Sequence, residues 1–373
     1  MRALYVTPSS FRTVNAGALR NLNIANSLVR EGHEVRLLIG DAPQDPIAPE
    51  WEELAENGVT ISAVGGARTG RWSKLRRVLG GTPIDAEHIG WADAVVLYNP
   101  SPFQYMRVAR DRRKVRRLVV DLSEWLAPSD LPGSWTSPYT WAYELFMRFL
   151  PTIVGRKGHV LAISRPMAEW IGKGGARVLV VPPLSDAEAQ TADVPETATT
   201  IVLSGSGIAK HGKDAAGLSR IVRLAETEPE ALRDLVFHIL GAVDSPTADR
   251  IAALGGRTRF VQHGWTDWPG SVHVVKNADW LLLLRDPDVR RHRLGYPSKV
   301  TEALTLGVPV IVNRCGGTTD YLDDGVNALI LDEITDVELT RVLDRARSLR
   351  LRHRDDRFRP SAWTVRLSDA VFG

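Results

Sequence analysis

The chain has 373 residues, of which 44% are hydrophobic and 24% charged, and its formal net charge is +3. This length allows two domains with proper cores, and the composition is that of an ordinary globular protein. The single cysteine, Cys315, excludes a disulfide framework and a zinc site built from cysteines. The start MRALYVTPSSF lacks a signal-peptide core, and no apolar run reaches membrane-spanning length, so we expect a cytoplasmic protein.

Short apolar runs alternate with helical patterns through the first half of the chain. Helices are expected over residues 18–30 and 166–172, each between runs that have the length of buried strands. The predicted strands lie at residues 3–7, 34–39, 59–63, 94–98, 118–121, 160–163 and 178–181. Repeated strand–helix units of this kind predict a parallel sheet, and hence a first α/β domain over residues 1–184.

The loop after the first predicted strand carries Gly17 and leads into an amphipathic helix. Glycine lets the backbone approach a ligand closely, and a helix N-terminus favours an anion. Many α/β proteins begin in this way, so this loop alone does not identify a ligand.

Two unusual segments follow in the first domain. The segment RVARDRRKVRR has seven basic residues and one aspartate, which fits an anionic membrane, a nucleic acid or a solvated helix face. The segment WTSPYTWAYELFMRFL is rich in aromatic residues and either touches lipid or an apolar acceptor, or packs as a helix between domains. We favour the solvated face and the packed helix, predict no nucleic-acid partner, and leave open peripheral contact with the inner face of a membrane.

A polar, proline-bearing segment interrupts the pattern, and we assign residues 185–199 to an interdomain linker. A second series then predicts strands at 200–204, 235–240, 258–261, 280–284 and 308–312, with helices at 214–226, 272–277, 298–306 and 336–349. It predicts a second doubly wound domain over residues 200–359. Ligands of such sheets bind beyond the carboxyl ends of the strands, so the cleft between two facing domains is the expected site.

The second domain opens with IVLSGSGIAKHGKDAAGL, which has a glycine-rich turn between a strand and a helix. Gly205 and Gly207 match two positions of a dinucleotide fingerprint, but Lys210 stands at the third, which argues against a nicotinamide cofactor. Glycines with Ser206, Lys210 and Lys213 at such a turn suit a diphosphate. The alternative is a solvated loop with two surface lysines.

Further along, the strand LLLL delivers Arg285 to its carboxyl end, where the guanidinium could face the cleft. Asp286 and Asp288 imitate a metal-binding Asp-x-Asp pattern, but we treat them as loop acids and predict no metal site.

The stretch RLGYPSKVTEALTLGVPVIVN is the most informative part of the sequence. Pro297 or Ser298 opens a helix, and Gly307 suits the left-handed residue that ends it. Lys299 and Glu302 then share one helical face near the N-terminus. They are either part of a ligand site or an ordinary ion pair on a solvated helix.

With these motifs in place, the chain resembles the two-domain GT-B glycosyltransferases of the large retaining family 4. The resemblance covers nearly the whole chain and is most specific in the second domain. It is carried by Gly17 with RNLNIANSLVREGHEV, by SGSGIAKHGKD, FVQHGW, LLLLR with GYPSKVTEALTLGVPVIVN, DDGVNALI, and the ending SAWTVRLSDAVF. The ending is similar to the C-terminal helix that crosses back onto the first domain in this family.

The resemblance implies two facing Rossmann-like domains, with the acceptor bound by the first domain plus a crossover helix at residues 360–373. The second domain would bind a nucleotide-sugar donor as substrate, with no cofactor and no metal. A hexosyltransferase-type enzyme of carbohydrate biosynthesis is expected, acting with retention. The donor-binding residues would be Gly17, Gly205, Ser206, Gly207, Lys210, Lys213, Trp265, Tyr296, Pro297, Ser298, Lys299, Val300 and Glu302.

Within this set, the amides of residues 298–300 would face the donor phosphates and Glu302 would hold the ribose hydroxyls, as carboxylates do in other nucleotide sites. The family pattern has a second glutamate, and counting back from Glu302 its position is taken by Leu294. Recognition of the donor sugar must therefore differ here. A Pro-Ser/Thr-Lys variant occurs in some members, which would give Lys299 a part in donor binding.

Sugar transfer builds positive charge on the sugar and negative charge on the departing diphosphate. Without a metal, Lys210, Lys213 and Arg285 are the groups suited to stabilise that anion, and we expect no dedicated nucleophile. In VVDLSEWLAP, Asp121 and Glu124 stand at the carboxyl end of a strand, where one could orient or deprotonate the acceptor hydroxyl. Glu124 is alternatively an N-terminal helix acid.

Other functions remain open on the sequence. The chain could be a sugar-nucleotide epimerase or a pseudo-glycosyltransferase of the same fold, or, because of Leu294, a non-catalytic sugar-nucleotide-binding subunit. The nucleotide base, the sugar and the acceptor are not fixed by these loops. A saccharide, a lipid-linked or a specialised-metabolite acceptor would each fit.

Overall fold

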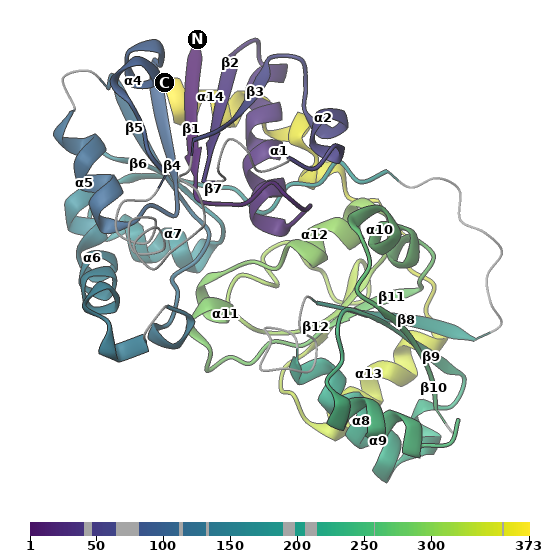
Figure 1. Ribbon diagram of the computed structural model, residues 1–373. Helices are drawn as coiled ribbons and strands as arrows, with labels where there is room; N and C mark the ends of the chain where they lie inside the picture. Colours follow the sequence, from purple (N-terminus) through teal and green to yellow (C-terminus); the bar gives the residue numbers. More distant parts are fainter. Residues whose placement is uncertain are drawn as a thin grey trace. The chain divides into compact units, whose positions relative to one another are not determined.

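The computed structural model in Figure 1 describes residues 1–40, 47–64, 82–111, 115–131, 134–188, 198–205, 215–256, 258–352 and 354–373. The chain forms two compact units. The first is Met1–Ser185 together with Leu294–Tyr296 and Arg359–Gly373, and the second is Asp186–Arg293 together with Pro297–Phe358. Each unit is an α/β layer structure around its own parallel sheet.

The first unit contains a seven-stranded sheet in the order β3-β2-β1-β4-β5-β6-β7. Every pair of neighbours is parallel, and the strand order reverses between β1 and β4. The strands are β1 (Arg2–Thr7), β2 (Glu34–Ile39), β3 (Val59–Ala63), β4 (Ala94–Tyr98), β5 (Arg117–Leu122), β6 (His159–Ala162) and β7 (Arg177–Val180). The predicted strands of this half are confirmed, each to within one residue at either end.

Helices cover both faces of the first sheet (Figure 1). One face buries a cluster with side chains of α5 and α6, and the other buries a cluster with α1 and α14. The helices are α1 (Ala16–Arg30), α2 (Glu50–Leu54), α4 (Ala86–Trp91), α5 (Pro102–Arg110), α6 (Pro138–Val154), α7 (Arg165–Gly172) and α14 (Thr364–Phe372), with 3-10 turns at Pro128–Asp130, Ser134–Thr136 and Pro360–Trp363.

The C-terminal helix α14 belongs to the first unit although it follows the second unit in sequence. Trp363, Leu367 and Val371 are buried in the same cluster as the inner face of α1. Ser27 of α1 donates a hydrogen bond of 3.0 Å to the Pro360 carbonyl. The predicted return of the chain end to the first domain is therefore confirmed.

The second unit contains a six-stranded sheet in the order β10-β9-β8-β11-β12-β13, again with parallel neighbours. Its strands are β8 (Thr199–Ser204), β9 (Leu235–Leu240), β10 (Arg259–Gly264), β11 (Trp280–Leu283), β12 (Val310–Asn313) and β13 (Ala328–Leu331). Its helices are α8 (Ala215–Thr227), α9 (Ser245–Ala253), α10 (Trp268–Lys276), α11 (Arg290–Leu294), α12 (Ser298–Thr305) and α13 (Asp336–Ser348), with 3-10 turns at Pro229–Leu232 and Asp356–Phe358. The last residue of α11, Leu294, belongs to the first unit.

Local chemistry explains where these helices begin and end. Helix α12 begins at Ser298 directly after Pro297, and the chain leaves it through Gly307, whose φ of 78° lies in the left-handed region that glycine tolerates. Both features were predicted. Helix α10 begins four residues before its predicted start, because Asp267 accepts a hydrogen bond from the Gly270 amide and caps it. Strand β13 was not predicted. No helix in the described ranges is long and apolar enough to cross a membrane.

Candidate active site

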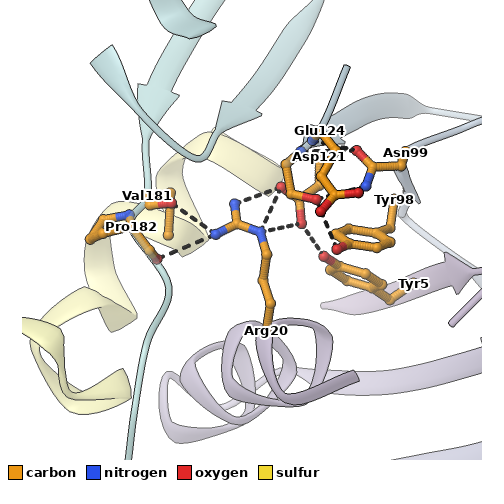
Figure 2. A network of polar contacts seen from close by, with 9 residues as sticks. Tyr5, Arg20, Tyr98, Asn99, Asp121, Glu124, Val181 and Pro182 are labelled. Carbon is orange, nitrogen blue, oxygen red and sulfur yellow. Dashed lines mark hydrogen bonds and ion pairs between the residues drawn. The ribbon is translucent and has the colours of Figure 1, made fainter. Parts of the chain in front are cut away.

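In the first unit, the strand order reverses between β1 and β4, and a polar network fills the carboxyl end of the sheet there (Figure 2). Its centre is Asp121, near the end of β5. Asp121 is 0% exposed. The Arg20 guanidinium, from α1, lies 2.7 Å from Asp121 Oδ1 through Nη2, and Nε lies 3.2 Å from both carboxylate oxygens. The Tyr5 hydroxyl donates to Asp121 Oδ2.

Arg20 also ties this centre to the chain after β7. Its Nη1 donates to the carbonyls of Val181 at 2.8 Å and Pro182 at 3.3 Å. Burial alone would lower the pKa of Arg20, but the Asp121 carboxylate outweighs it and the pKa is raised. Burial, followed by the charge of Asp121, raises the pKa of the Tyr5 hydroxyl. All of these groups are held within the protein, so the predicted catalytic candidate Asp121 is part of an internal ion pair.

A second chain of hydrogen bonds leads from this centre toward Glu124. The Ser123 hydroxyl donates to the Tyr98 oxygen at 2.8 Å and accepts from Asn99 Nδ2 at 2.6 Å. Asn99 Oδ1 accepts in turn from the amides of Ser123 at 2.9 Å and Glu124 at 3.4 Å. Asn99 has a φ of 41°, a left-handed conformation that costs free energy outside glycine. The Asn99 side chain thus fixes the loop that carries Glu124, which is itself partly exposed.

Gly17 lies against the same network. A Cβ atom placed on Gly17 would be 3.1 Å from Ser9 Oγ and 3.4 Å from the Tyr98 hydroxyl. Burial raises the pKa of Tyr98 well above its ordinary value, so this hydroxyl stays protonated at neutral pH. The structure therefore brings Gly17, Asp121 and Glu124 to one end of the first sheet, with Tyr98 between them.

The sequence alone did not single out Tyr5, Arg20, Tyr98, Asn99 or Ser123. One signal was present: Arg20 is the only charged residue of α1 before Arg30, and it stands among residues of the buried face. A lone cation on the inner face of a helix requires a buried partner. Which carboxylate that is could not be read, because Asp121 lies 101 residues further along the chain.

In the second unit, glycines meet at the carboxyl ends of β8, β9 and β10. The Gly205 amide donates to the Leu240 carbonyl at 3.0 Å, and the Gly241 amide donates to the Gly264 carbonyl at 2.8 Å. Gly241 has a φ of 130°, and a Cβ atom there would come within 1.9 Å of the Gly205 carbonyl oxygen. The predicted phosphate-loop residues Ser206, Gly207, Lys210 and Lys213 lie outside the described residues.

Arg285 lies beyond the carboxyl end of β11, next to the point where the second strand order reverses. Asn313 at the end of β12 holds its backbone on both sides: Oδ1 accepts from the Arg285 amide at 2.7 Å, and Nδ2 donates to its carbonyl at 2.9 Å. His292 is buried nearby, with Nδ1 2.9 Å from the Asp286 carbonyl oxygen. Burial and the charge of Arg285 lower the pKa of His292 to about 4.

The first two turns of α12 carry the Lys299–Glu302 pair that the sequence predicted. Lys299 Nζ lies 3.1 Å from Glu302 Oε1 and 3.3 Å from Ser271 Oγ. Trp268 Nε1 donates to Glu302 Oε2 at 3.3 Å. Glu302 is only 7% exposed, so this is not an ion pair on a solvated helix face. A buried carboxylate held by two donors is instead a fixed acceptor with lone pairs to spare.

The other predicted donor residues fall into different surroundings. Pro297 occupies the N-cap position of α12 without a side-chain cap. The Val300 amide already donates to the Pro297 carbonyl at 3.1 Å, which leaves the Ser298 and Lys299 amides without a partner inside the helix. Trp265 follows the left-handed Gly264 and is 73% exposed.

Tyr296 is buried and belongs to the first unit, together with Leu294. The Leu294 side chain packs against a hydrophobic cluster of that unit, and its carbonyl accepts a hydrogen bond from Ser164 Oγ. Leu294 is thus used for packing at the position where the family pattern has its first glutamate.

The two loop acids after β11 do not form a metal centre with other described groups. The Asp288 amide donates to Asp286 Oδ1 at 2.8 Å, so Asp286 stabilises its own turn. Within the described part of the chain, no group of three or more histidine, cysteine, aspartate or glutamate side chains is placed to hold a metal ion.

Comparison with known families assigns most of the chain. Residues 16–184 match the model of the glycosyl transferase 4-like domain, and residues 207–359 match the model of the glycosyl transferases group 1. No curated protein matches the sequence.

Solved structures with the same architecture include several glycosyltransferases. A glycosyltransferase from Rickettsia africae ESF-5 is 13% identical with a TM-score of 0.63, over 100% of this chain and 94% of that chain. Anabaena Alr3699/HepE in complex with UDP-glucose is 14% identical with a TM-score of 0.60, over 100% and 95%. Sucrose-phosphate synthase from Thermosynechococcus elongatus is 12% identical with a TM-score of 0.64, over 100% and 95%. At these identities the likeness shows the fold, and it confirms the predicted fold class.

Proposed function

Because the chain belongs to the group 1 glycosyltransferases of the GT-B type, with a family 4-like first part, we propose that it moves a sugar from a nucleotide-diphosphate donor to an acceptor hydroxyl. In this proposal the second unit, with the domain at residues 200–359, binds the donor. The first unit, with residues 1–184 and the helix at 360–373, binds the acceptor, and residues 185–199 join the two. Transfer proceeds with retention and without a metal ion.

The observation that carries the proposal is the placement of Glu302. Its carboxylate is buried, oriented by Lys299 and Trp268, and located in the second turn of a helix whose orphan amides stand one turn away. A carboxylate in a fixed orientation accepts hydrogen bonds from two adjacent hydroxyls, and helix-start amides attract phosphate. We assign Glu302 to the donor ribose and the amides of Ser298 and Lys299 to the donor phosphates.

The leaving diphosphate gains negative charge as the sugar departs, and cations must be in place before the reaction. We assign this role to Arg285 at the end of β11, and to Lys210 and Lys213 in the loop after β8. Gly205, Ser206 and Gly207 would let the backbone of that loop approach the phosphates. Trp265, exposed beside Gly264, is our candidate for contact with the base.

For the acceptor we keep Glu124 as the residue that orients or deprotonates the hydroxyl. It is partly exposed, and its amide is held by Asn99. Asp121 has no exposed surface and both of its oxygens contact Arg20 or Tyr5, so we assign it a positioning role through those partners. Gly17, against Tyr98, would keep space open beside Glu124 for a bound ligand.

Donor binding is tested by thermal shift with UDP, GDP, ADP, CDP and dTDP, because a ligand of the native state raises the melting temperature. UDP is the first to try, since the Anabaena neighbour was solved with UDP-glucose. Glu302→Gln removes the charge at nearly constant shape and should weaken the binding of the active nucleotide about 10- to 100-fold, as expected for a charge-assisted bond of about 1.5–3 kcal/mol. Glu230→Ala, on an exposed glutamate of the same unit, is the matched control.

An unchanged dissociation constant in Glu302→Gln would remove the ribose assignment. Transfer itself is tested with a radiolabelled nucleotide sugar and a cell extract as acceptor source. Release of nucleoside diphosphate with label moved to an acceptor supports the proposal. Binding without any release would favour a non-catalytic subunit, and isomerised nucleotide sugar would favour an epimerase. The replacement of the family's first glutamate by Leu294 makes this comparison necessary.

A further inference from the structure

Two neighbouring helices of the first unit expose large apolar side chains. Helix α6 buries one face against the sheet, whereas its solvent-facing stripe carries Trp141, Leu145, Phe149 and Ile153 at a spacing of four residues. Helix α5 likewise exposes Phe103 and Met106. These six side chains, which we call the α5–α6 surface, are between 43% and 60% exposed. Isolated exposed apolar residues are ordinary, but six on adjacent helices mark an interaction surface.

The two helices lie on the same face of the sheet, so their outer stripes belong to one surface. Tyr105 of α5 and Phe146 of α6 pack with ring centroids 5.7 Å apart, and both are buried in the same hydrophobic cluster. Figure 1 shows α5 and α6 side by side on this flank of the first unit. The inner contact fixes the helices next to each other, and the exposed stripes point away from the sheet.

The charges around this surface have one predominant sign. Arg107 and Arg110 are exposed on the outer side of α5, and Arg148 lies within the exposed stripe of α6. Arg156 and Lys157 are exposed directly after α6. On the two helices themselves acidic residues are scarce: the one acid within α6, Glu144, is 3% exposed, and Asp111 is the exposed acid at the end of α5.

We propose that the α5–α6 surface docks this protein on an anionic lipid membrane, with the two helices lying in the interface. Interfacial helices combine an apolar stripe rich in tryptophan, phenylalanine and leucine with flanking lysine and arginine, which is the arrangement here. The stripe enters the headgroup boundary, and the cations bind lipid phosphates. A second copy of the chain fits less well, because a two-fold contact would bring the same arginines against each other.

The proposal is independent of the transfer reaction and is tested with vesicles and the full chain. In co-sedimentation at low salt, the protein should bind vesicles of phosphatidylcholine with 30% phosphatidylglycerol at least tenfold more strongly than vesicles of phosphatidylcholine alone. Binding should weaken at 0.5 M salt, because screening acts on the arginine contribution. Leu145→Ser with Phe149→Ser should reduce binding to the anionic vesicles at least tenfold, and Arg148→Glu several-fold.

Val337→Ser with Val365→Ser is the matched control, since both valines are strongly exposed elsewhere on the molecule. The control should leave vesicle binding unchanged, and circular dichroism melts should match the wild type for all variants because the replaced side chains face solvent. The proposal is overturned if the wild type stays unbound at low salt, or if the α6 variant binds as the wild type does. Concentration-dependent dimers in analytical ultracentrifugation that the α6 substitutions abolish would instead assign the surface to a second copy.

Discussion

The two sheets share a strand order that reverses once, yet their carboxyl ends are built differently. At the reversal point of the first sheet, Arg20, Asp121 and Tyr5 satisfy one another in a buried network. At that of the second sheet, the backbone segments of Gly205 and Gly241 pack closely against each other, and Lys299 and Glu302 lie in the first two turns of a helix. The first end is a rigid support for the residues at its margin. In our proposal, the second end supplies helix-start amides and cations to a ligand.

The largest effect is expected from breaking the support in the first unit. Arg20→Ala leaves the fully buried Asp121 carboxylate with the Tyr5 hydroxyl as its main remaining partner. Removal of one member of a buried ion pair typically costs about 3–5 kcal/mol. We expect a loss of this size in the free energy of unfolding of the first unit, measured by calorimetry with the two units treated as separate transitions.

The matched variant removes both charges at once. In Arg20→Met with Asp121→Leu no unpaired charge is left, so much of the stability should return. If the single variant is as stable as the wild type, the network is not a support. If the double variant is no better than the single one, the loss comes from packing and not from the uncompensated charge.

In the second unit, the substitution expected to destabilise the end of the sheet most is at a glycine. Gly241→Ala would place a Cβ atom 1.9 Å from the Gly205 carbonyl oxygen at a φ of 130°. Backbone strain and overpacking together should cost on the order of 3 kcal/mol. Because Gly205 leads into the proposed phosphate loop, the melting-temperature increase with nucleoside diphosphate should also be lost.

Gly264→Ala is the control that introduces backbone strain at a positive φ without a steric clash of the new Cβ atom. Gly264 has a φ of 69°, but nothing lies within 4 Å of a Cβ atom there, so we expect the free energy of unfolding to fall by only about 1–2 kcal/mol. If Gly241→Ala keeps both its stability and its response to nucleotide, then the backbone at the end of β9 is not a constraint on the donor site.

A smaller effect in stability, but a specific one in activity, is expected at Asn99. Asn99→Ala removes the acceptor of the Ser123 amide and leaves alanine in a left-handed conformation. Together these changes should lower the free energy of unfolding by about 2 kcal/mol. Since Asn99 positions the loop of Glu124, kcat should fall about tenfold while the KM for the donor stays constant. Asn99→Gly relieves the backbone without restoring the acceptor, and Asn99→Asp keeps the acceptor. Recovery of kcat in the aspartate variant and not in the glycine variant would assign the role to Oδ1.

The sequence predicted the parts of the molecule that short-range chemistry decides. Repeated apolar runs placed the strands of both sheets, and the GYPSK and TLG segments placed both ends of α12, because proline and glycine act on the backbone locally. A run of four apolar residues does not identify a strand by itself: β11, also of four residues, was predicted, whereas β13, ALIL, was missed.

The supporting contacts of the site could not be predicted in the same way. Glu302 and Lys299 are three positions apart on one helix, and their contact follows from the helical repeat. Trp268, which orients the same carboxylate, is 34 residues away, and Arg20 meets Asp121 across 101 residues. Contacts between residues so far apart in the chain depend on how the helices and strands pack together, and this packing cannot be inferred from a single sequence.

The smallest expected effect concerns the pH dependence of the second unit. His292 is 3% exposed, and burial, the charge of Arg285 and that of Arg291 lower its pKa to about 4, against a partial opposing effect of Asp286. Above about pH 6.5 the imidazole is neutral in both the folded and unfolded chains, so it does not affect stability. Between pH 6.5 and 4 the unfolded chain binds a proton that the folded chain does not, and the stability of this unit falls.

His292→Asn removes that proton uptake and keeps a donor for the Asp286 carbonyl. When the pH is lowered from 7.5 to 5.0, the melting temperature of the variant should fall about 2–4 °C less than that of the wild type. This difference corresponds to roughly 1 kcal/mol in the free energy of unfolding, once solvent screening is allowed for. His273→Asn, on an exposed histidine of α10, should behave as the wild type. Equal acid sensitivity in all three proteins would mean that His292 is not held neutral. Protonation of the buried His292 would then not contribute to the acid response of the second sheet end.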